Sequence, residues 1–255
     1  MDREHLCSEE TKDDECIILQ SVIVGPSREL EKFSVIIEDI NDNAPYFENS
    51  KISLDISEDV PEGTSLMLDD QARDRDSGSN GQLKYKLKGS GGVFTLKVEE
   101  EGPLIMLVVQ KALDRETLDL YQLQLVATDC GEQSVIAPPQ REIRVMVEDV
   151  NDNAPHFSQT GYQLEVEENN EPALTLLQVS ATDADSGLNG RVTYRLDKRT
   201  SAIFKVDSVT GQLSALVPLD REQKSVHQLT VFARDSGVPP LESQASVIIR
   251  HRLWA

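Results

Sequence analysis

The chain has 255 residues and is strongly acidic, because 45 Asp and Glu residues stand against 25 Lys and Arg and give a formal net charge of −20. Such a surface repels phosphate, which argues against proteins that bind nucleic acids or anionic membranes. Aromatic residues make up only 5% of the chain, so its core must be largely aliphatic and divided among small units. The longest aliphatic run, residues 104–109, is far shorter than the roughly twenty residues that span a membrane.

The sequence has three cysteines, no Cys-x-x-Cys motif and only four histidines, so it does not favour a zinc site. Cys7 and Cys16 are close enough in sequence to close a small loop, whereas Cys130 stands alone in a Thr-Asp-Cys-Gly segment. The residues leave two interpretations of Cys7 and Cys16 open: an extracellular disulfide or two reduced thiols.

Four segments are expected to form strands, because apolar and polar residues alternate along them. In chain order they are residues 121–127, 143–147, 229–233 and 245–249. A single apolar face is typical of half-buried antiparallel strands. Gly, Pro, Asn and Asp cluster at the breaks, and no stretch longer than about ten residues has a helical period. The chain is therefore predicted to be all-β.

Four short motifs recur in the same order along the chain. Asp-x-Asn-Asp-Asn-Ala-Pro stands at 39–45 and 149–155, Asp-Arg-Glu at 2–4, 114–116 and 220–222, Asp-x-Asp-Ser-Gly-x-Asn-Gly at 74–81 and 183–190, and Ala-x-Asp-x-Gly at 127–131 and 233–237. Their common period of roughly 110 residues indicates a tandem array of one small domain. A domain of this size with many short strands is most simply a two-sheet sandwich.

The residues that recur are Asp, Glu and Asn in loops, whereas the strands between them differ, so the loops carry a chemical constraint. Calcium takes about six to eight oxygen ligands from carboxylates, amides and backbone carbonyls, which these loops can supply. Alternate side chains of an extended segment face opposite ways, so Asp149 and Asn151 would face one side of the linker and Asp152 the other. Asp and Asn also favour turns in their own right, but that explains any single motif better than four at one period.

The Asp-x-Asp-x-Gly segments do not fit an EF-hand. Position six of an EF-hand loop must be Gly and position twelve Glu. Counted from Asp74, these positions hold Ser79 and Tyr85, and the copy that begins at Asp183 fails at the same two places. The ligands must therefore come from distant parts of the chain.

Taken together, the four motifs resemble cadherin repeats over nearly the whole chain, and residues 183–194 resemble the protocadherin branch in particular. The resemblance implies tandem Greek-key β-sandwich repeats of about seven strands each, joined by calcium-binding linkers. It divides the chain into 1–45, the C-terminal part of a first and outermost repeat, 46–155, a complete repeat, and 156–255, a repeat without its terminal linker. It also favours a disulfide between Cys7 and Cys16, since protocadherins carry a short disulfide loop in their outermost repeat.

If the family geometry applies, calcium lies at the junctions between repeats. The second junction is expected to use oxygen atoms of Glu58, Asp114, Glu116, Asp149, Val150, Asn151, Asp152, Asn153, Asp183, Asp185, Asn189 and Asp235. The first is expected to use Asp2, Glu4, Asp39, Asn41, Asp42, Asn43, Asp74, Asp76, Asn80 and Asp129. A third junction would begin with Glu168, Asp220 and Glu222.

The third junction is expected to lack its linker. When the last strand is aligned with its counterpart in the preceding repeat, His251, Leu253 and Trp254 replace the acidic ligands of the linker. At the other end, Gly25 stands where later repeats have an aspartate that reaches back to the preceding junction, as an outermost repeat would. We therefore expect the chain to be a piece of a longer receptor.

The resemblance implies calcium-dependent, homophilic cell–cell adhesion, with Ca²⁺ as the bound ion. The partners would be cadherin repeats of the same or a related protein on an opposing cell, with no nucleic acid and no small-molecule substrate. The expected location is the extracellular side of the plasma membrane, held there by a membrane-anchored parent. Catalysis by paired carboxylates, as in glycosidases, is disfavoured because these acids recur at every junction. A calcium-stiffened spacer, or a segment that recognises a different protein, remains the alternative.

Overall fold

The computed structural model of the chain describes residues 6–7, 16–24, 26, 29–69, 71–99, 104–131 and 139–252. Asp2, Glu4, Gly25, Leu253 and Trp254, which carry some of the predictions above, lie outside these residues. The chain divides into two compact units, Met1–Glu148 and Asp149–Ala255, and each is described by itself. No helix within the described ranges is long and apolar enough to cross a lipid bilayer.

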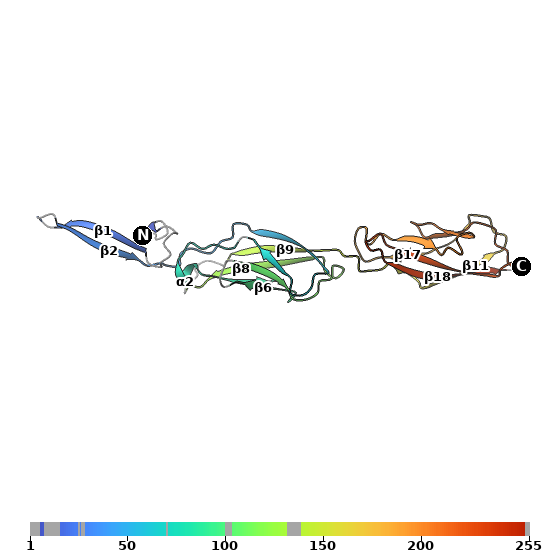
Figure 1. Cartoon of the computed structure of the whole chain (residues 1–255), viewed down its shortest axis with the longest axis horizontal. Coiled ribbons are helices and arrows are strands. Elements are labelled where there is room, and N and C mark those ends of the chain that lie inside the picture. The colour runs from blue at the N-terminus through green and yellow to red at the C-terminus, as the bar shows by residue number, and fades with distance from the viewer. Residues whose placement is uncertain are drawn as a thin grey trace. The chain divides into compact units, whose positions relative to one another are not determined.

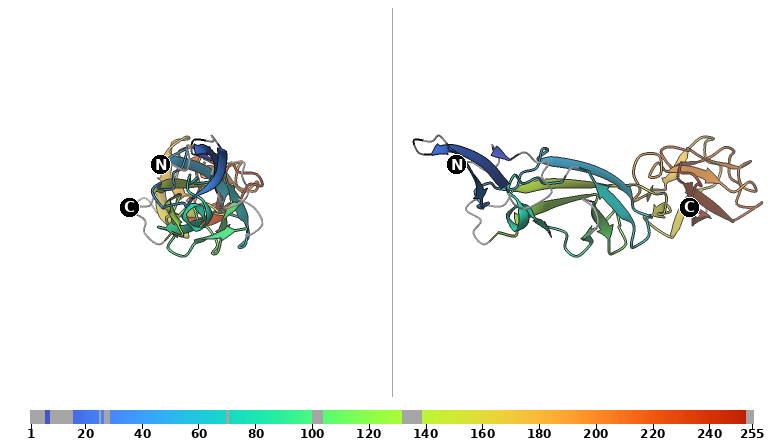
Figure 2. Two further views of the ribbon diagram at one scale, coloured as in Figure 1. Left: turned by 90° about the vertical axis from the view of Figure 1, so that its left-hand side faces the viewer. Right: turned by 60° about the vertical axis from the view of Figure 1, so that its left-hand side comes forward.

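The first unit contains a two-stranded hairpin, β1 (Cys16–Val24) and β2 (Glu29–Ile37), drawn in blue in Figures 1 and 2. The strands are antiparallel, with Cys16 opposite Ile37. A disulfide joins Cys7 to Cys16, whose Cα atoms are 6.0 Å apart, and Cys16 is buried. Two strands alone cannot cover their apolar side chains. Leu19, for example, is 80% exposed.

The rest of the first unit is a sandwich of two sheets, which we call the second repeat. Its seven strands are β3 (Lys51–Ser57), β4 (Ser65–Leu68), β5 (Leu83–Lys88), β6 (Phe94–Val98), β7 (Ile105–Val109), β8 (Leu120–Asp129) and β9 (Gln140–Glu148). One sheet has the order β3-β9-β8-β5 and the other β4-β7-β6. Figure 1 labels β6, β8 and β9, together with α2 (Gly78–Gly81), a four-residue helix that precedes β5.

The core of the second repeat lies between its two sheets. β3 pairs with β9 in parallel, and the other strand pairs of the sandwich are antiparallel. Leu123 and Leu125 of β8 and Ile143 and Val145 of β9 are completely or almost completely buried. These are the apolar positions of the alternating pattern, so the strands predicted at 121–127 and 143–147 are confirmed.

The second unit is a sandwich of the same kind, which we call the third repeat. Its strands are β10 (His156–Phe157), β11 (Gly161–Glu167), β12 (Thr175–Gln178), β13 (Ala181–Thr182), β14 (Thr193–Leu196), β15 (Phe204–Val206), β16 (Gln212–Ala215), β17 (Val226–Arg234) and β18 (Glu242–Arg252). They form the sheets β11-β18-β17-β14 and β12-β16-β15 and the short pair β10-β13. β11 runs parallel to β18, as β3 does to β9.

The apolar positions of β17 and β18 again face the core. Leu229 and Val231 of β17 and Val247 and Ile249 of β18 are all at most 1% exposed. The strands predicted at 229–233 and 245–249 are confirmed, and so is the fold class, an all-β array of tandem β-sandwiches.

The last strand is longer than the alternating pattern indicates. β18 continues through His251 and Arg252, which pair with Val166 and Glu167 of the parallel strand β11. The Arg252 guanidinium also donates two hydrogen bonds to Glu165 at 2.9 and 3.2 Å. β18 therefore extends beyond residue 250 because the backbone of β11 pairs with its last two residues.

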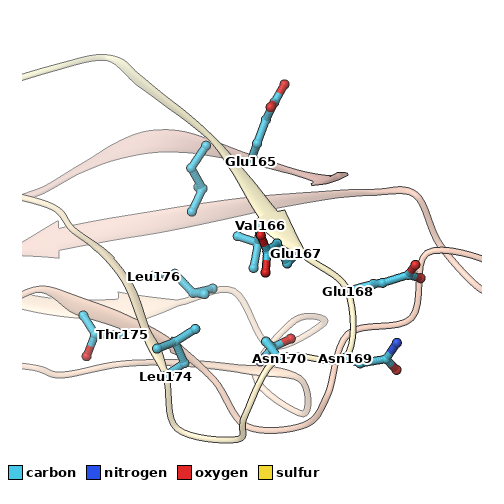
Figure 3. A pocket seen from close by; sticks show the side chains of 10 residues that line it. Glu165, Val166, Glu167, Glu168, Asn169, Asn170, Leu174, Thr175 and Leu176 are labelled. Atoms are coloured by element: carbon cyan, nitrogen blue, oxygen red, sulfur yellow. The ribbon is translucent and has the colours of Figure 1, made fainter. Parts of the chain in front are cut away.

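An open pocket of about 470 Å³ lies beside β11 and β12 of the third repeat (Figure 3). Residues 164–170 and 174–176 line it. Its apolar lining includes Leu164, Val166 and Leu176, three side chains that also pack against the core. The pocket is therefore an uncovered edge of the third repeat's core.

The two repeats differ at one position beside this pocket. The loop after β3 packs Val60 against the core of the second repeat. The equivalent residue after β11 is Asn170, whose side chain instead accepts the backbone N–H of Leu219 at 3.0 Å. The same loops differ again three residues later, where Gly63 has φ +91° and Ala173 has φ +66°.

Candidate metal centre

The repeated motifs form two pairs of segments in the described structure. We call residues 39–43 and 149–153 the first and second linker, and residues 74–81 and 183–190 the first and second acidic loop. The first linker contacts the first acidic loop within the unit Met1–Glu148. The second linker contacts the second acidic loop within the unit Asp149–Ala255.

Each acidic loop is shaped by hydrogen bonds of its own. The Oδ1 atoms of Asp74 and Asp183 accept the backbone N–H of Asp76 and Asp185, each at 3.0 Å. These are short turns in which an aspartate bonds the backbone two residues on. The loop ends at a glycine because a Cβ atom on Gly190 would overlap the carbonyl oxygen of Asp185. The motif thus dictates a compact turn.

The first residue of each linker accepts hydrogen bonds from the acidic loop. Asp149 Oδ1 accepts the backbone N–H of Ser186 at 2.9 Å, and Asp149 Oδ2 accepts the side-chain amide of Asn189 at 2.9 Å. The first linker has both bonds at 3.0 Å, between Asp39, Ser77 and Asn80. Each linker aspartate is therefore oriented by the acidic loop that it contacts.

The last residue of each linker bonds both carboxylate oxygens of a buried aspartate. Asn153 donates its backbone N–H to Asp185 Oδ2 at 3.3 Å and its amide to Asp185 Oδ1 at 2.8 Å. Asn43 bonds Asp76 in the same way, at 3.1 and 2.6 Å. Asp185 is only 7% exposed, and an ionised carboxylate can be buried only when such donors compensate its lost hydration.

The middle of each linker meets the Ala-x-Asp-x-Gly motif. Asn151 donates its amide to Asp235 Oδ2 at 3.2 Å and to the carbonyl of Pro239 at 2.6 Å. The N–H of Gly237 donates to Asp235 Oδ1 at 3.0 Å, and a Cβ atom on Gly237 would overlap the Asn151 side chain. The first copy has equivalent contacts between Asn41, Asp129 and Gly131.

Three oxygen atoms in these segments are buried without a hydrogen-bond donor. They are Asp74 Oδ2, Asp183 Oδ2 and Asn151 Oδ1. Buried polar atoms are normally satisfied, so each one indicates a missing partner. A hard divalent cation would fill this role, because it accepts electron pairs from oxygen. The residues present therefore fit calcium.

The ionisation of the two aspartates supports this fit. Burial raises the pKa of the Asp183 carboxyl, and the neighbouring charges of Asp185 and Asp235 raise it further, against the opposing bond from the Asp185 N–H. Burial likewise raises the pKa of the Asp74 carboxyl. Crowded anions of this kind favour a bound cation, which would stabilise their charged forms.

Three predicted ligands of the second junction belong to the second repeat, and hydrogen bonds or an ion pair within that repeat orient their side chains. Glu58 is buried, and its Oε2 accepts the backbone N–H of Arg115 at 2.8 Å. Asp114 Oδ1 accepts the backbone N–H of Thr117 at 3.0 Å. Glu116 pairs with the Arg115 guanidinium. Their participation in a metal site, like that of every other predicted ligand, stays a prediction.

The end of the third repeat differs from a linker-bearing end. Within the described residues, Glu168, Asp220 and Glu222 do not gather into a cluster of three potential metal ligands. His251 packs edge-on against His227, with ring centroids 5.3 Å apart, and burial lowers the pKa of the His251 imidazole. The structure therefore places an edge-on imidazole pair where the second repeat continues into a linker.

The sequence interpretation overlooked some residues that shape the site. Ser186 supplies a backbone donor to Asp149, and Gly237 both donates to Asp235 and leaves room for Asn151. Both belong to motifs that occur twice, so the signal was present. The chemistry of their side chains does not mark these two residues as part of the site, because both act through the backbone.

Comparison with known proteins places these repeats in a family. The family described as Cadherin domain matches residues 52–148 and 162–250. Among curated relatives, human Protocadherin-16 is 39% identical over 240 residues, which cover 90% of this chain and 7% of that protein. Human Protocadherin gamma-C4 is 38% identical over 258 residues, which cover 97% of this chain and 26% of that protein. The chain thus spans a small part of the length of these relatives.

Solved structures agree with the sequence matches. A structure described as mouse clustered PcdhgC3 EC1-3 has a TM-score of 0.84 and 34% identity, and the match covers 99% of this chain and 81% of that one. A crystal structure of Protocadherin Gamma C5 EC1-3 has a TM-score of 0.86 and 32% identity, with coverages of 98% and 80%. The relatives and structures named here are protocadherins, and the chain belongs to the cadherin family.

Proposed function

We propose that the chain is a calcium-dependent adhesive segment of a cell-surface receptor. Its linkers hold Ca²⁺, and the stiffened repeats contact cadherin repeats of the same or a related protein on an opposing cell. The receptor acts on the extracellular side of the plasma membrane. Its acidic residues bind a cation and take part in no catalysis.

The observation that carries this proposal is the set of buried oxygen atoms without donors, Asp74 Oδ2, Asp183 Oδ2 and Asn151 Oδ1. They lie in both copies of the acidic loop and in the second linker. The candidate metal ligands are carboxylate and amide oxygens, which calcium prefers. Zinc instead prefers Cys and His ligands.

The proposed ligands fall into two sets. Those of the first linker and its acidic loop are Asp39, Asn41, Asp42, Asn43, Asp74, Asp76, Asn80 and Asp129. Those of the second are Asp149, Val150, Asn151, Asp152, Asn153, Asp183, Asp185, Asn189 and Asp235. We propose further ligands from the preceding ends of the repeats: Asp2, Glu4, Glu58, Asp114, Glu116, Glu168, Asp220 and Glu222.

The mechanism follows from charge. The chain has a net charge of −20 and places several carboxylates close together in each linker and acidic loop. Without a cation these carboxylates repel one another, and the repulsion loosens the segment. Bound calcium supplies the opposite charge. The linker asparagines and the loop aspartates then hold one another in a fixed geometry, so that successive repeats present a defined face to a partner.

Calcium binding is tested by titration calorimetry on Asp74→Asn and Asp183→Asn variants. Each substitution keeps the side-chain shape but removes one anionic ligand, so we expect affinity at the corresponding linker to fall at least about tenfold. Asp55→Asn is the matched control, because Asp55 is exposed on β3 and outside both acidic loops. Equal affinities in all four proteins would refute the metal site.

Adhesion is tested with beads that carry the chain, mixed with and without calcium. We expect aggregation only with calcium, and much less of it with the Asp74→Asn/Asp183→Asn double variant. Aggregation that ignores both calcium and the variant would contradict the proposal. Intact calcium binding without aggregation would favour the spacer or the heterophilic alternative.

A further inference from the structure

The edge strand β5 of the second repeat carries a row of three lysines. Its sequence is Leu-Lys-Tyr-Lys-Leu-Lys, with Lys84, Lys86 and Lys88 exposed and the alternate residues partly buried. Because alternate side chains of a strand share one face, the three lysines project from the outer face of the sheet β3-β9-β8-β5. Neighbours in the row are about 6.8 Å apart along the strand.

Among the residues that the structure describes, the row has no anionic partner of its own. Within the described residues, no ion pair joins Lys84, Lys86 or Lys88 to a carboxylate. The nearest acid in register is Glu142, one strand beyond Gln124 and therefore two strands from Lys88.

That acid is already neutralised by other bases. Glu142 pairs with Lys51 at 3.1 Å and with Arg144 at 2.7 Å. Hydrogen bonds from Arg144 and Lys51 hold the pKa of the Glu142 carboxyl below its usual value, so it stays ionised and engaged. This part of the sheet is therefore a positive patch on a protein that is strongly negative as a whole.

The third repeat shows that the fold does not require these lysines. Tyr85 of β5 corresponds to Tyr194 of β14, so the three positions are occupied there by Thr193, Arg195 and Asp197. Arg195 is fully engaged, with two hydrogen bonds to Glu242 and a stacking contact 4.0 Å from the Phe232 ring centroid. Lysines on an edge strand also discourage unwanted strand pairing. β14 is an edge strand too and does without them.

We propose that Lys84, Lys86 and Lys88 form a binding surface for a sulfated polysaccharide of the glycosaminoglycan class. A straight, open row of ammonium groups matches a linear polyanion, whose charges recur along its length, and the flexible lysine stems can adjust to it. The residues opposite the row on β8 are Gln124, Val126 and Thr128. Val126, the apolar one, is only 5% exposed, so the accessible surface beside the row is polar. A protein partner would be expected to find an apolar centre there. Affinity would come from released counterions, as it does for proteins on nucleic acids.

The test measures binding of the whole chain to immobilised heparin over a range of salt concentrations, with calcium present. By the relation established for DNA, three neutralised charges give a roughly 40-fold fall in affinity between about 50 and 200 mM salt. We expect the Lys84→Gln/Lys86→Gln/Lys88→Gln variant to lose most of this salt dependence and to elute from heparin at clearly lower salt.

The matched control is Lys198→Gln/Arg199→Gln/Lys205→Gln, which removes three exposed positive charges from the third repeat instead. It should bind heparin like the parent chain, because it changes net charge equally but leaves the row intact. Polyglutamate serves as a second probe and should bind more weakly than heparin. Equal loss in both triple variants, no loss in either, or a preference for polyglutamate would overturn the proposal.

Discussion

The second and third repeats agree closely at their linkers and differ over the rest of their surfaces. The amide of Asn43 bonds Asp76 at 2.6 Å, and that of Asn153 bonds Asp185 at 2.8 Å. The bonds from the linker asparagines 41 and 151 to their aspartates differ by only 0.1 Å, at 3.1 and 3.2 Å. Such agreement between segments with different flanking strands shows that the linkers satisfy one chemical requirement twice.

Away from the linkers the two sandwiches have diverged. Val60 packs against the core of the second repeat, whereas the equivalent Asn170 bonds the backbone of Leu219. Lys86 is replaced in the third repeat by Arg195, which pairs with Glu242. A β-sandwich tolerates such changes because its stability depends on the inward-facing positions of each strand. The surfaces can therefore acquire separate roles while the linkers and acidic loops stay alike.

The largest expected effect is a loss of stability from substitutions in the two cores, and it tests whether the cores unfold independently. Leu123→Ala and Leu229→Ala each remove a side chain that is at most 1% exposed, so each should lower the free energy of unfolding of its own repeat by about 3 kcal/mol. Hydrogen exchange, read repeat by repeat, checks whether the other repeat keeps its protection. Leu188→Ala is the control, because Leu188 is 63% exposed. Equal loss of protection in both repeats would show that the cores are not independent.

A smaller effect tests the equivalence of the linkers. Gly131→Ala and Gly237→Ala each place a Cβ atom on the side chain of a linker asparagine, which must then move away from its aspartate. Overpacking of this kind costs about 1–3 kcal/mol, so calcium affinity at the affected linker should fall by roughly tenfold or more. Calorimetric titration should show matching losses in the two variants. A loss in only one of them would mean that the linkers are not equivalent.

The smallest expected effect is a change in stability when the Gly and Ala at equivalent positions of the two repeats are exchanged. Ala173 has φ +66°, a left-handed conformation that costs a residue with a Cβ atom about 1 kcal/mol, so Ala173→Gly should stabilise the third repeat by up to that amount. Gly63→Ala should destabilise the second repeat similarly, since Gly63 has φ +91° and its Cβ would meet no neighbouring atom within 4 Å. Thermal unfolding of both variants measures the shifts. Shifts of the same sign would exclude backbone strain as the cause.

Much of the fold could be predicted because its signals are local and repeated. Alternation placed Leu123, Ile143, Leu229 and Val247 in the core, and burial of these residues is what the structure shows. The motifs gave the linkers and acidic loops because turn-forming aspartates and glycines bond their own neighbours, as Asp183 does with Asp185.

Other features depend on segments that are far apart in sequence. The length of β18 depends on the pairing of His251 and Arg252 with β11, and the pocket depends on how residues 164–170 and 174–176 come together. That Asp183 Oδ2 is buried without a donor likewise follows from packing, since nothing in an Asp-x-Asp pattern says which oxygen faces solvent. The alternation of apolar and polar residues along one strand contains no information about contacts between segments that are far apart in sequence.

The hydrogen bonds of each linker have a practical consequence for dissecting the protein. Asn151 and Asn153 donate to Asp235 and Asp185, so the second linker is structurally the first segment of the repeat that follows it. A recombinant third repeat that begins at His156 would lack these asparagines. It would leave the carboxylates of Asp185 and Asp235, which are at most 7% exposed in the intact chain, without two of their hydrogen-bond donors. The portable module of this protein is a sandwich together with the linker upstream of it, and shortened versions should begin no later than Asp149.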